Sequence, residues 1–313
     1  MIRKFCRIFC VVFLIADFQS SQSQFDNNRK NHLIPSNING PLSLPDDALH
    51  QASIRLINKD ITFGEGHICS GSLISTRVVL TAARCLFNLD FKTPRHPSEL
   101  IVVMGTSDRY QRTLDTVTSG ITHIRYPTSF DLESMRDDIG LLFLSREIPE
   151  KHSTIRPIEL NWKITDNYVR GSVTGWDLSK NGDLSRQLLI ANVSILDRNN
   201  CKHNVEQLLI TKRMICGRYM REMDKRIYQS DVGAPLVIAG KQIGLASITM
   251  SNYSTLSDKL VIYTDVAYHK EWIWTELRDE NNNDSSVWGL LGFLILTWFA
   301  FREKQKLSFR LCL

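Results

Sequence analysis

The stretch VVLTAARCL, residues 78–86, brings a permanently charged side chain to the end of an apolar run. Thr81, Ala82 and Ala83 make a turn of small residues, and Arg84 stands between that turn and Cys85. A guanidinium group carries five N–H donors and no acceptor, and its pKa lies far above neutral pH. Arg84 can therefore hold a carboxylate or another anion, but it cannot serve as a general base.

Four cysteines lie in the middle of the chain: Cys69, Cys85, Cys201 and Cys216. Four cysteines allow three connectivities, of which two local pairs, 16 and 15 residues apart, are the simplest. Each such loop would add ~3 kcal/mol of stability in the chain-entropy model. Zinc ligation is the alternative, but no Cys-x-x-Cys spacing occurs, and we expect neither a metal nor another cofactor.

Charge is concentrated at the two ends. Of the net charge of +5, residues 1–23 carry +2 and residues 302–313 carry +3, so the remainder has no net charge. A nucleic-acid partner would need basic residues on the folded part, and we therefore expect none.

The first 23 residues have the order of a secretory signal peptide. A basic start, MIRKFCR, precedes the apolar run IFCVVFLIA, and polar residues follow at 20–23. We predict cleavage near 21–23 and a polar N-terminal segment over 24–37; a short buried helix is the alternative. Export would place the chain in an oxidising compartment, which favours disulfides over zinc.

Near the other end, residues 287–301 form a run of fifteen residues without a charge, preceded by a polar linker over 279–286. As a helix the run would span ~22 Å, against ~30 Å for a bilayer core. Two tryptophans suit the interface, and the basic residues 302–313 suit a cytoplasmic tail. We predict a transmembrane segment with the folded domain outside the cell; a GPI-anchor signal and an apolar tail packed on the protein remain alternatives.

Short apolar runs separated by turn residues dominate the middle of the chain and predict an all-β sandwich or pair of barrels. The runs 234–239 and 242–248 should form a hairpin that turns at Gly240-Lys241. Residues 267–279 are the best helix, with Tyr268/Trp272 and Ile273/Leu277 spaced as one buried stripe. The runs that read as strands are ELIVVMGT, DIGLLFLS, RQLLIANVSIL, APLVIAG, KQIGLASITM and LVIYTDV.

Six motifs in this order resemble the chymotrypsin-like serine proteases of the trypsin family, over residues 38–278. The resemblance implies two antiparallel six-stranded β-barrels, an active site in the crevice between them and a C-terminal helix. It also implies the disulfides Cys69–Cys85 and Cys201–Cys216. The motifs are HICSGSLISTRVVLTAARC (67–85), DDIGLLFL (137–144), VTGWD (173–177), MICG (214–217), SDVGAPLV (230–237) and IYTDV with EWI (262–273).

The resemblance places the catalytic triad at Arg84, Asp138 and Val232. Arg84 replaces the histidine that serves as general base, and Val232 replaces the nucleophilic serine; Asp138 matches the orienting carboxylate. Ser230 is no substitute, because it precedes Asp231 whereas the family's nucleophile follows that aspartate. Since the base and the nucleophile are both lost, we predict a non-catalytic homologue.

Other positions depart from the family pattern as well. Arg226 falls at the floor of the former specificity pocket, and Thr249 replaces a glycine of its wall, beside Ser247. The best match to the family's activation site is SNINGP (36–41), which lacks a preceding basic residue, so Asp231 would need a donor other than a freed amine. Two family disulfides are missing at both partners, one at Gly171 and Ile238 and the other at Tyr228, with no cysteine in 249–258.

Arg84 and Asp138 should lie side by side in this fold, and we hypothesise a bidentate guanidinium–carboxylate pair that props the cleft. The alternative is neutral drift with Arg84 pointing to solvent. Asn192, Asn252 and Asn283 begin Asn-x-Ser sequons that an exported chain can glycosylate.

We therefore interpret the chain as a secreted or membrane-tethered binding or regulatory protein. Its partner would be an unknown protein, such as a protease or a protease substrate. A working peptidase with an unorthodox site and a structural surface component are the alternatives.

Overall fold

The structure is a computed structural model of residues 1–313, and it describes the folded part of the chain. All described residues belong to one compact unit, Pro41–Leu313. The predicted signal peptide and residues 287–301 lie outside them, and no helix among the described residues has the length and apolarity needed to cross a membrane. The described residues are 44, 46–163, 168–176, 185–204, 210–220, 231–249 and 260–280, without the side chains of 202–204 and 249.

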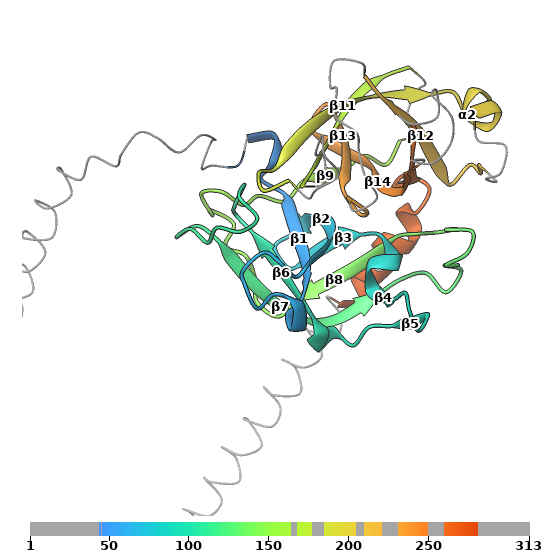
Figure 1. Ribbon diagram of the computed structural model, residues 1–313. Coiled ribbons are helices and arrows are strands. Elements are labelled where there is room, and N and C mark those ends of the chain that lie inside the picture. Colours follow the sequence, from blue (N-terminus) through green and yellow to red (C-terminus); the bar gives the residue numbers. More distant parts are fainter. Residues whose placement is uncertain are drawn as a thin grey trace, which may run out of the picture. The chain divides into compact units, whose positions relative to one another are not determined.

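Six antiparallel strands of the N-terminal half close into a barrel, in blue to green in Figure 1. Their order around the barrel is β1-β2-β3-β8-β7-β6, and pairing of Ala52 with Met104 belongs to the β1–β6 contact that closes it. The strands are β1 (Gln51–Leu56), β2 (His67–Ser75), β3 (Val78–Thr81), β6 (Leu100–Met104), β7 (Val117–Arg125) and β8 (Gly140–Leu144).

A second closed barrel follows in the C-terminal half, with strand order β13-β10-β11-β12-β15-β14 and closure by β13–β14. The short strand β9 (Glu159–Leu160) adds to β14 in parallel. Two six-stranded antiparallel barrels confirm the fold class implied by the resemblance. The strands are β10 (Arg170–Gly175), β11 (Leu189–Leu196), β12 (Met214–Tyr219), β13 (Pro235–Ile238), β14 (Lys241–Thr249) and β15 (Leu260–Asp265).

The six apolar runs singled out in the sequence form β6, β8, β11, β13, β14 and β15, because Val, Ile and Leu pack well on both sides of a barrel wall. The predicted turn between β13 and β14 is wrong by one residue. The chain turns at Ala239-Gly240, where φ is +49° and +75°, and Lys241 already begins β14. Two successive positive φ values match the right-handed twist of the strands in a two-residue hairpin.

Several short elements connect the strands. The ribbon β4 (Phe87–Asn88) and β5 (Thr93–Pro94) projects from the loop after β3. The remaining short elements are the 3₁₀ turns η1 (Asp46–Ala48), η2 (Ile57–Lys59), η3 (Ala83–Leu86) and η4 (Pro97–Glu99) and the helix α2 (Arg198–Asn204).

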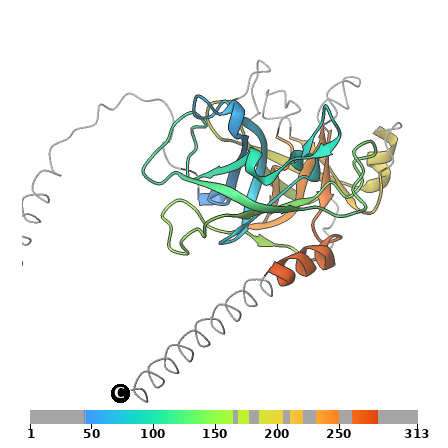
Figure 2. The same cartoon turned by 90° about the horizontal axis from the view of Figure 1, so that it is seen from below.

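Residues 270–280 are helical and follow the second barrel in sequence, yet they pack on the core of the first. Ile273 is fully buried there, and Trp272 and Leu277 are partly buried against the same core. Figure 2 shows this helix in red-orange. The predicted stripe is wrong for Tyr268, which lies in the turn before the helix with 38% of its surface exposed and faces the Arg213 guanidinium at 5.0 Å.

Buried hydrogen bonds join the two barrels to each other. Ser72 Oγ donates to Gln242 Oε1 at 2.6 Å, and Thr174 Oγ1 donates to Gln51 Oε1 at 2.6 Å. All four residues are nearly inaccessible to water, so these bonds help to fix the relative position of the two barrels.

Candidate functional site

Arg84 reaches the crevice from η3, the single turn that follows β3. Ala82 and Ala83 are fully buried, and Ala82 has an extended backbone with φ −77° and ψ 141°. Larger side chains at these two positions would not fit, so the small-residue turn brings the Arg84 backbone close to β8. Only 17% of the Arg84 side chain is exposed, which excludes the interpretation that it points freely to solvent.

Asp138 receives two donors from Arg84, one on each oxygen. The Arg84 backbone N–H donates to Oδ1 at 2.9 Å, and Nε donates to Oδ2 at 2.9 Å. The expected fork of two guanidinium donors is therefore wrong in detail, because the backbone amide supplies the second bond. The pairing itself is present, and Asp138 is completely buried. A charge-assisted bond of this kind is among the stronger hydrogen bonds in proteins.

Ser247 on β14 extends the contact to the second barrel. Its hydroxyl donates to Asp138 Oδ2 at 2.6 Å, and Arg84 Nη2 donates to the same hydroxyl at 3.1 Å and to the Ser247 carbonyl oxygen. Thr264 Oγ1 holds the other side by donating to the Asp138 carbonyl at 2.9 Å. Arg84 thus bridges the barrels, with its turn on the first and its terminal nitrogen on the second.

Val232 lies in a tight turn that faces Arg84 across the crevice. Its carbonyl accepts the Ser70 N–H at 2.9 Å, and its isopropyl group packs, partly buried, against the first-barrel core. Gly233 has φ +83°, and a side chain there would collide with the Ser70 carbonyl and Thr81. The turn is therefore rigidly built, and the side chain that it presents is purely hydrocarbon.

Asp231 precedes Val232 and is nearly buried, with 7% of its surface exposed. Its Oδ1 accepts the Trp176 backbone N–H at 3.0 Å and the Ser70 hydroxyl at 3.4 Å. A side chain at Gly175 would overlap this carboxylate, so the glycine makes room for it. These donors satisfy the requirement that Asp231 find hydrogen bonds within the folded domain.

An open cleft of about 490 Å³ lies next to Arg84 and Val232. Arg84, Val232 and Ser247 all line it, together with the Cys69–Cys85 disulfide, so the structure brings two positions assigned to the triad and one assigned to the specificity pocket to one site. The lining residues are Leu56, Lys59, Ile68, Cys69, Arg84, Cys85, Phe87, Leu89, Arg95, Val232, Ser247 and Ile248.

Both implied disulfides form, Cys69–Cys85 and Cys201–Cys216, each with Cα atoms 6.1 Å apart. The positions assigned to one missing disulfide are also neighbours. A Cβ atom built on Gly171 would lie 2.9 Å from Ile238 Cγ1. The sequence alignment with the family is therefore in register at this pair.

The structure gives less information on the other site residues predicted from the sequence. Asn192 is exposed on β11, as a glycosylation acceptor must be. Thr249 belongs to β14, but its side chain lies outside the described residues. The same is true of the whole of Arg226, Tyr228, Ser230, Asn252 and Asn283.

A second buried carboxylate, on the residue before Asp138, holds a cluster of partners that the sequence did not predict. Asp137 has φ +54°, and its oxygens contact His269 Nε2 at 2.9 Å, Ser129 Oγ at 2.6 Å and the Arg213 guanidinium. Burial alone would raise the pKa of Asp137, but the bonds from His269, Ser129 and Arg213 outweigh it and hold that pKa well below its usual value. Two adjacent aspartates in the sequence indicate a polar site, but the residues next to them do not predict which side chains bind Asp137.

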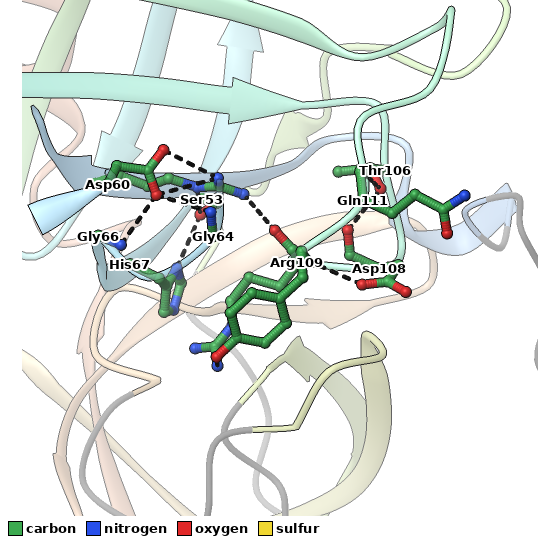
Figure 3. A network of polar contacts seen from close by, with 11 residues as sticks. Ser53, Asp60, Gly64, Gly66, His67, Thr106, Asp108, Arg109 and Gln111 are labelled. Atoms are coloured by element: carbon green, nitrogen blue, oxygen red, sulfur yellow. Dashed lines mark hydrogen bonds and ion pairs between the residues drawn. The ribbon is translucent and has the colours of Figure 1, made fainter. Parts of the chain in front are cut away.

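A buried polar network in the first half of the chain was also not predicted (Figure 3). Asp60 Oδ1 accepts the Gly64 and Gly66 backbone N–H groups at 2.8 and 2.9 Å, and Asp60 pairs with the fully buried Arg55 at 3.4 Å. Arg55 Nε donates to Ser53 Oγ, which contacts His67 Nδ1 at 2.8 Å. Burial, aided by the charges of Arg109 and Arg55, lowers the pKa of His67 to about 3.

Comparison with known proteins agrees with this geometry. The family model described as Trypsin matches residues 45–273. Trypsin eta of Drosophila melanogaster is 30% identical over 213 residues, which are 66% of this chain and 75% of the relative. Trypsin of Phaedon cochleariae is 29% identical over 66% of this chain and 78% of its own length, and trypsin zeta of Drosophila melanogaster is 28% identical over 72% and 79%.

Proposed function

The chain belongs to the trypsin family, and we propose that within this family it is a non-catalytic homologue that works as a binding or regulatory protein. The observation that carries the proposal is the contact between Arg84 Nε and Asp138 Oδ2 at 2.9 Å. Proton transfer from a serine needs an acceptor beside the orienting carboxylate. Arg84 occupies that place with a group that only donates.

Val232 supports the same conclusion from the other side of the cleft. Acyl transfer begins when a hydroxyl oxygen or a thiol sulfur attacks the carbonyl carbon of the substrate. The isopropyl group of Val232 has no lone pair and cannot make this attack. In subtilisin the triad acts as a unit, because replacing the nucleophile or the base alone removes about as much activity as replacing all three residues. Here the base and the nucleophile are both absent from their positions.

Arg84 also binds a main-chain carbonyl oxygen of the residues that line the cleft. Its Nη2 donates to the carbonyl oxygen of Ser247 on β14, a group that an extended peptide could otherwise use for strand pairing. The cleft retains about 490 Å³ of open volume beside this contact. Binding in the cleft is thus supported, but in a register different from one that pairs with Ser247.

We propose export as the setting for this function. Two disulfides stabilise the domain, and such bonds persist in extracellular proteins. The basic and apolar leader over 1–23 directs the chain to the secretory pathway, and residues 287–301 tether it to a membrane with the domain outside. The exposed Asn192 carries a glycan in this setting.

The decisive experiment combines two measurements on the purified full chain. We expect no hydrolysis of a mixed peptide library and no labelling by a serine-reactive fluorophosphonate, with trypsin as the positive control. Turnover that disappears on Val232→Phe, which fills the cleft, would overturn the proposal and establish a peptidase with an unorthodox site. Labelling that maps to a serine in the cleft would do the same.

A further inference from the structure

The cleft beside Arg84 combines an apolar lining with an excess of cationic side chains. Among the described residues that line it, three are cations and none is an aspartate or glutamate. Leu89 is 56% exposed on this surface, and Phe87 and the Cys69–Cys85 disulfide are buried residues of the same lining. A surface of this kind favours a ligand that carries negative charge next to hydrocarbon groups.

Arg95 is the least exposed of the three cations that line the cleft. Its side chain is only 14% exposed, and its Nε is buried without a hydrogen-bond partner. Glu99 is its ion-pair partner at 3.6 Å, but that carboxylate also accepts the His96 backbone N–H at 2.7 Å in the capping box of η4. A buried guanidinium with an unmade bond gains free energy when a ligand supplies an acceptor.

Lys59 and Arg84 also line the cleft. Lys59 ends η2, is exposed, and has no ion pair among the described residues. Arg84 uses Nε to bind Asp138 and Nη2 to bind Ser247. Its Nη1 makes no hydrogen bond within the described part of the chain. Each cation therefore has at least one N–H donor that no described residue accepts.

We propose that the cleft binds an extended protein segment with a carboxylate side chain flanked by apolar residues. This inference rests on the proposed function and adds the class of partner to it. The carboxylate pairs with Arg95 and Lys59, while the apolar neighbours contact Leu89, Ile68 and the disulfide. An isolated anion would leave the apolar lining uncovered, so a peptide gains area that a free carboxylate cannot.

The test uses fluorescence anisotropy with the full chain and two labelled octapeptides. The first is Gly-Ser-Leu-Asp-Glu-Leu-Ser-Gly, and the second has Lys-Lys in place of Asp-Glu. We expect the acidic peptide to bind at least about tenfold more tightly, and the preference to shrink as salt rises from 50 to 500 mM. Sodium acetate at millimolar concentration serves as the free-anion probe.

Charge-reversal variants locate the binding. Lys59→Glu and Arg95→Glu should each weaken the acidic peptide by about fivefold to tenfold. Lys151→Glu, an exposed position outside the cleft lining, makes the same charge change and should leave affinity within about twofold. Arg95→Gln tests the same contact should the reversal impair folding, and circular dichroism of each variant verifies the fold.

Each outcome decides a different point. Equal affinity for both peptides, or equal losses in Lys59→Glu and Lys151→Glu, overturns the inference while the proposed function stands. Acetate that competes as strongly as the peptide shows that the cleft takes free anions and also overturns it. Cleavage of either octapeptide overturns the proposed function itself, whatever the affinity.

Discussion

Arg84→Ala is the substitution that most directly tests the bridge between the barrels. It removes the Nε bond to Asp138 and the Nη2 contacts with Ser247. The backbone N–H at position 84 still donates to Asp138 Oδ1 at 2.9 Å, and the Ser247 hydroxyl still donates to Oδ2 at 2.6 Å. The variant therefore leaves a fully buried carboxylate with hydrogen bonds but without its cation.

The expected loss follows from that geometry. Breaking a buried ion pair on one side costs about 3–5 kcal/mol, because the remaining charge is uncompensated. Two retained hydrogen bonds, and the entry of water where a side chain 17% exposed has been removed, reduce the loss to about 2–3 kcal/mol. For a domain of this size that loss lowers Tm by about 5–10 °C.

Calorimetry and urea unfolding of the purified full chain measure this loss. Arg146→Ala removes an exposed arginine just after β8 and should change Tm by no more than about 2 °C. Arg84→Ala with Asp138→Asn should recover part of the loss, because the unpaired charge is gone. If Arg84→Ala melts within 2 °C of Arg146→Ala, the arginine does not hold the barrels together and our reasoning fails.

Three further predictions concern pH, packing and catalysis. Because burial lowers the pKa of His67 to about 3, the unfolded chain binds a proton below pH 6.5 that the folded chain does not. Stability should fall by about 1.4 kcal/mol per pH unit on this account as pH drops from 6.5 toward 3, and urea midpoints of His67→Gln should show a shallower fall. Gly171→Cys with Ile238→Cys should form a disulfide, read by thiol titration, and raise stability by about 1–3 kcal/mol; free thiols in the folded variant would contradict the alignment. Fluorophosphonate should label the double variant Arg84→His/Val232→Ser and neither single variant, because base and nucleophile act as a unit.

Half of the twelve barrel strands could be predicted because their apolar runs are continuous, as in β8 and β15, where every residue is buried. β1 was missed although all six of its residues are buried, since Ser53 and Arg55 interrupt the apolar pattern. Arg55 is tolerated there only because Asp60 and the Arg109 carbonyl, at 3.0 Å, satisfy its guanidinium. Two separate loops, one after η2 and one after β6, supply those partners, and no local sequence pattern predicts this.

The contacts of the candidate site were likewise predicted only in part from the sequence. The positions of Arg84 and Asp138 followed from motif order, and their pairing needed only that the motifs keep family spacing. The Ser247 contact joins residues 163 positions apart, and His269 meets Asp137 across 132 positions. Such contacts depend on how two barrels meet, and hydrophobic periodicity carries no information about that.

The terminal helix has a consequence for how this protein is made. Trp272, Ile273 and Leu277 complete the core of a barrel whose last strand ends at Leu144. A growing chain that has released only its N-terminal half therefore exposes an unsealed apolar surface until nearly all of the folded region has been synthesised. Chaperones should stay bound to the nascent first barrel for that interval, and truncation before residue 270 should yield aggregates rather than a half-sized domain.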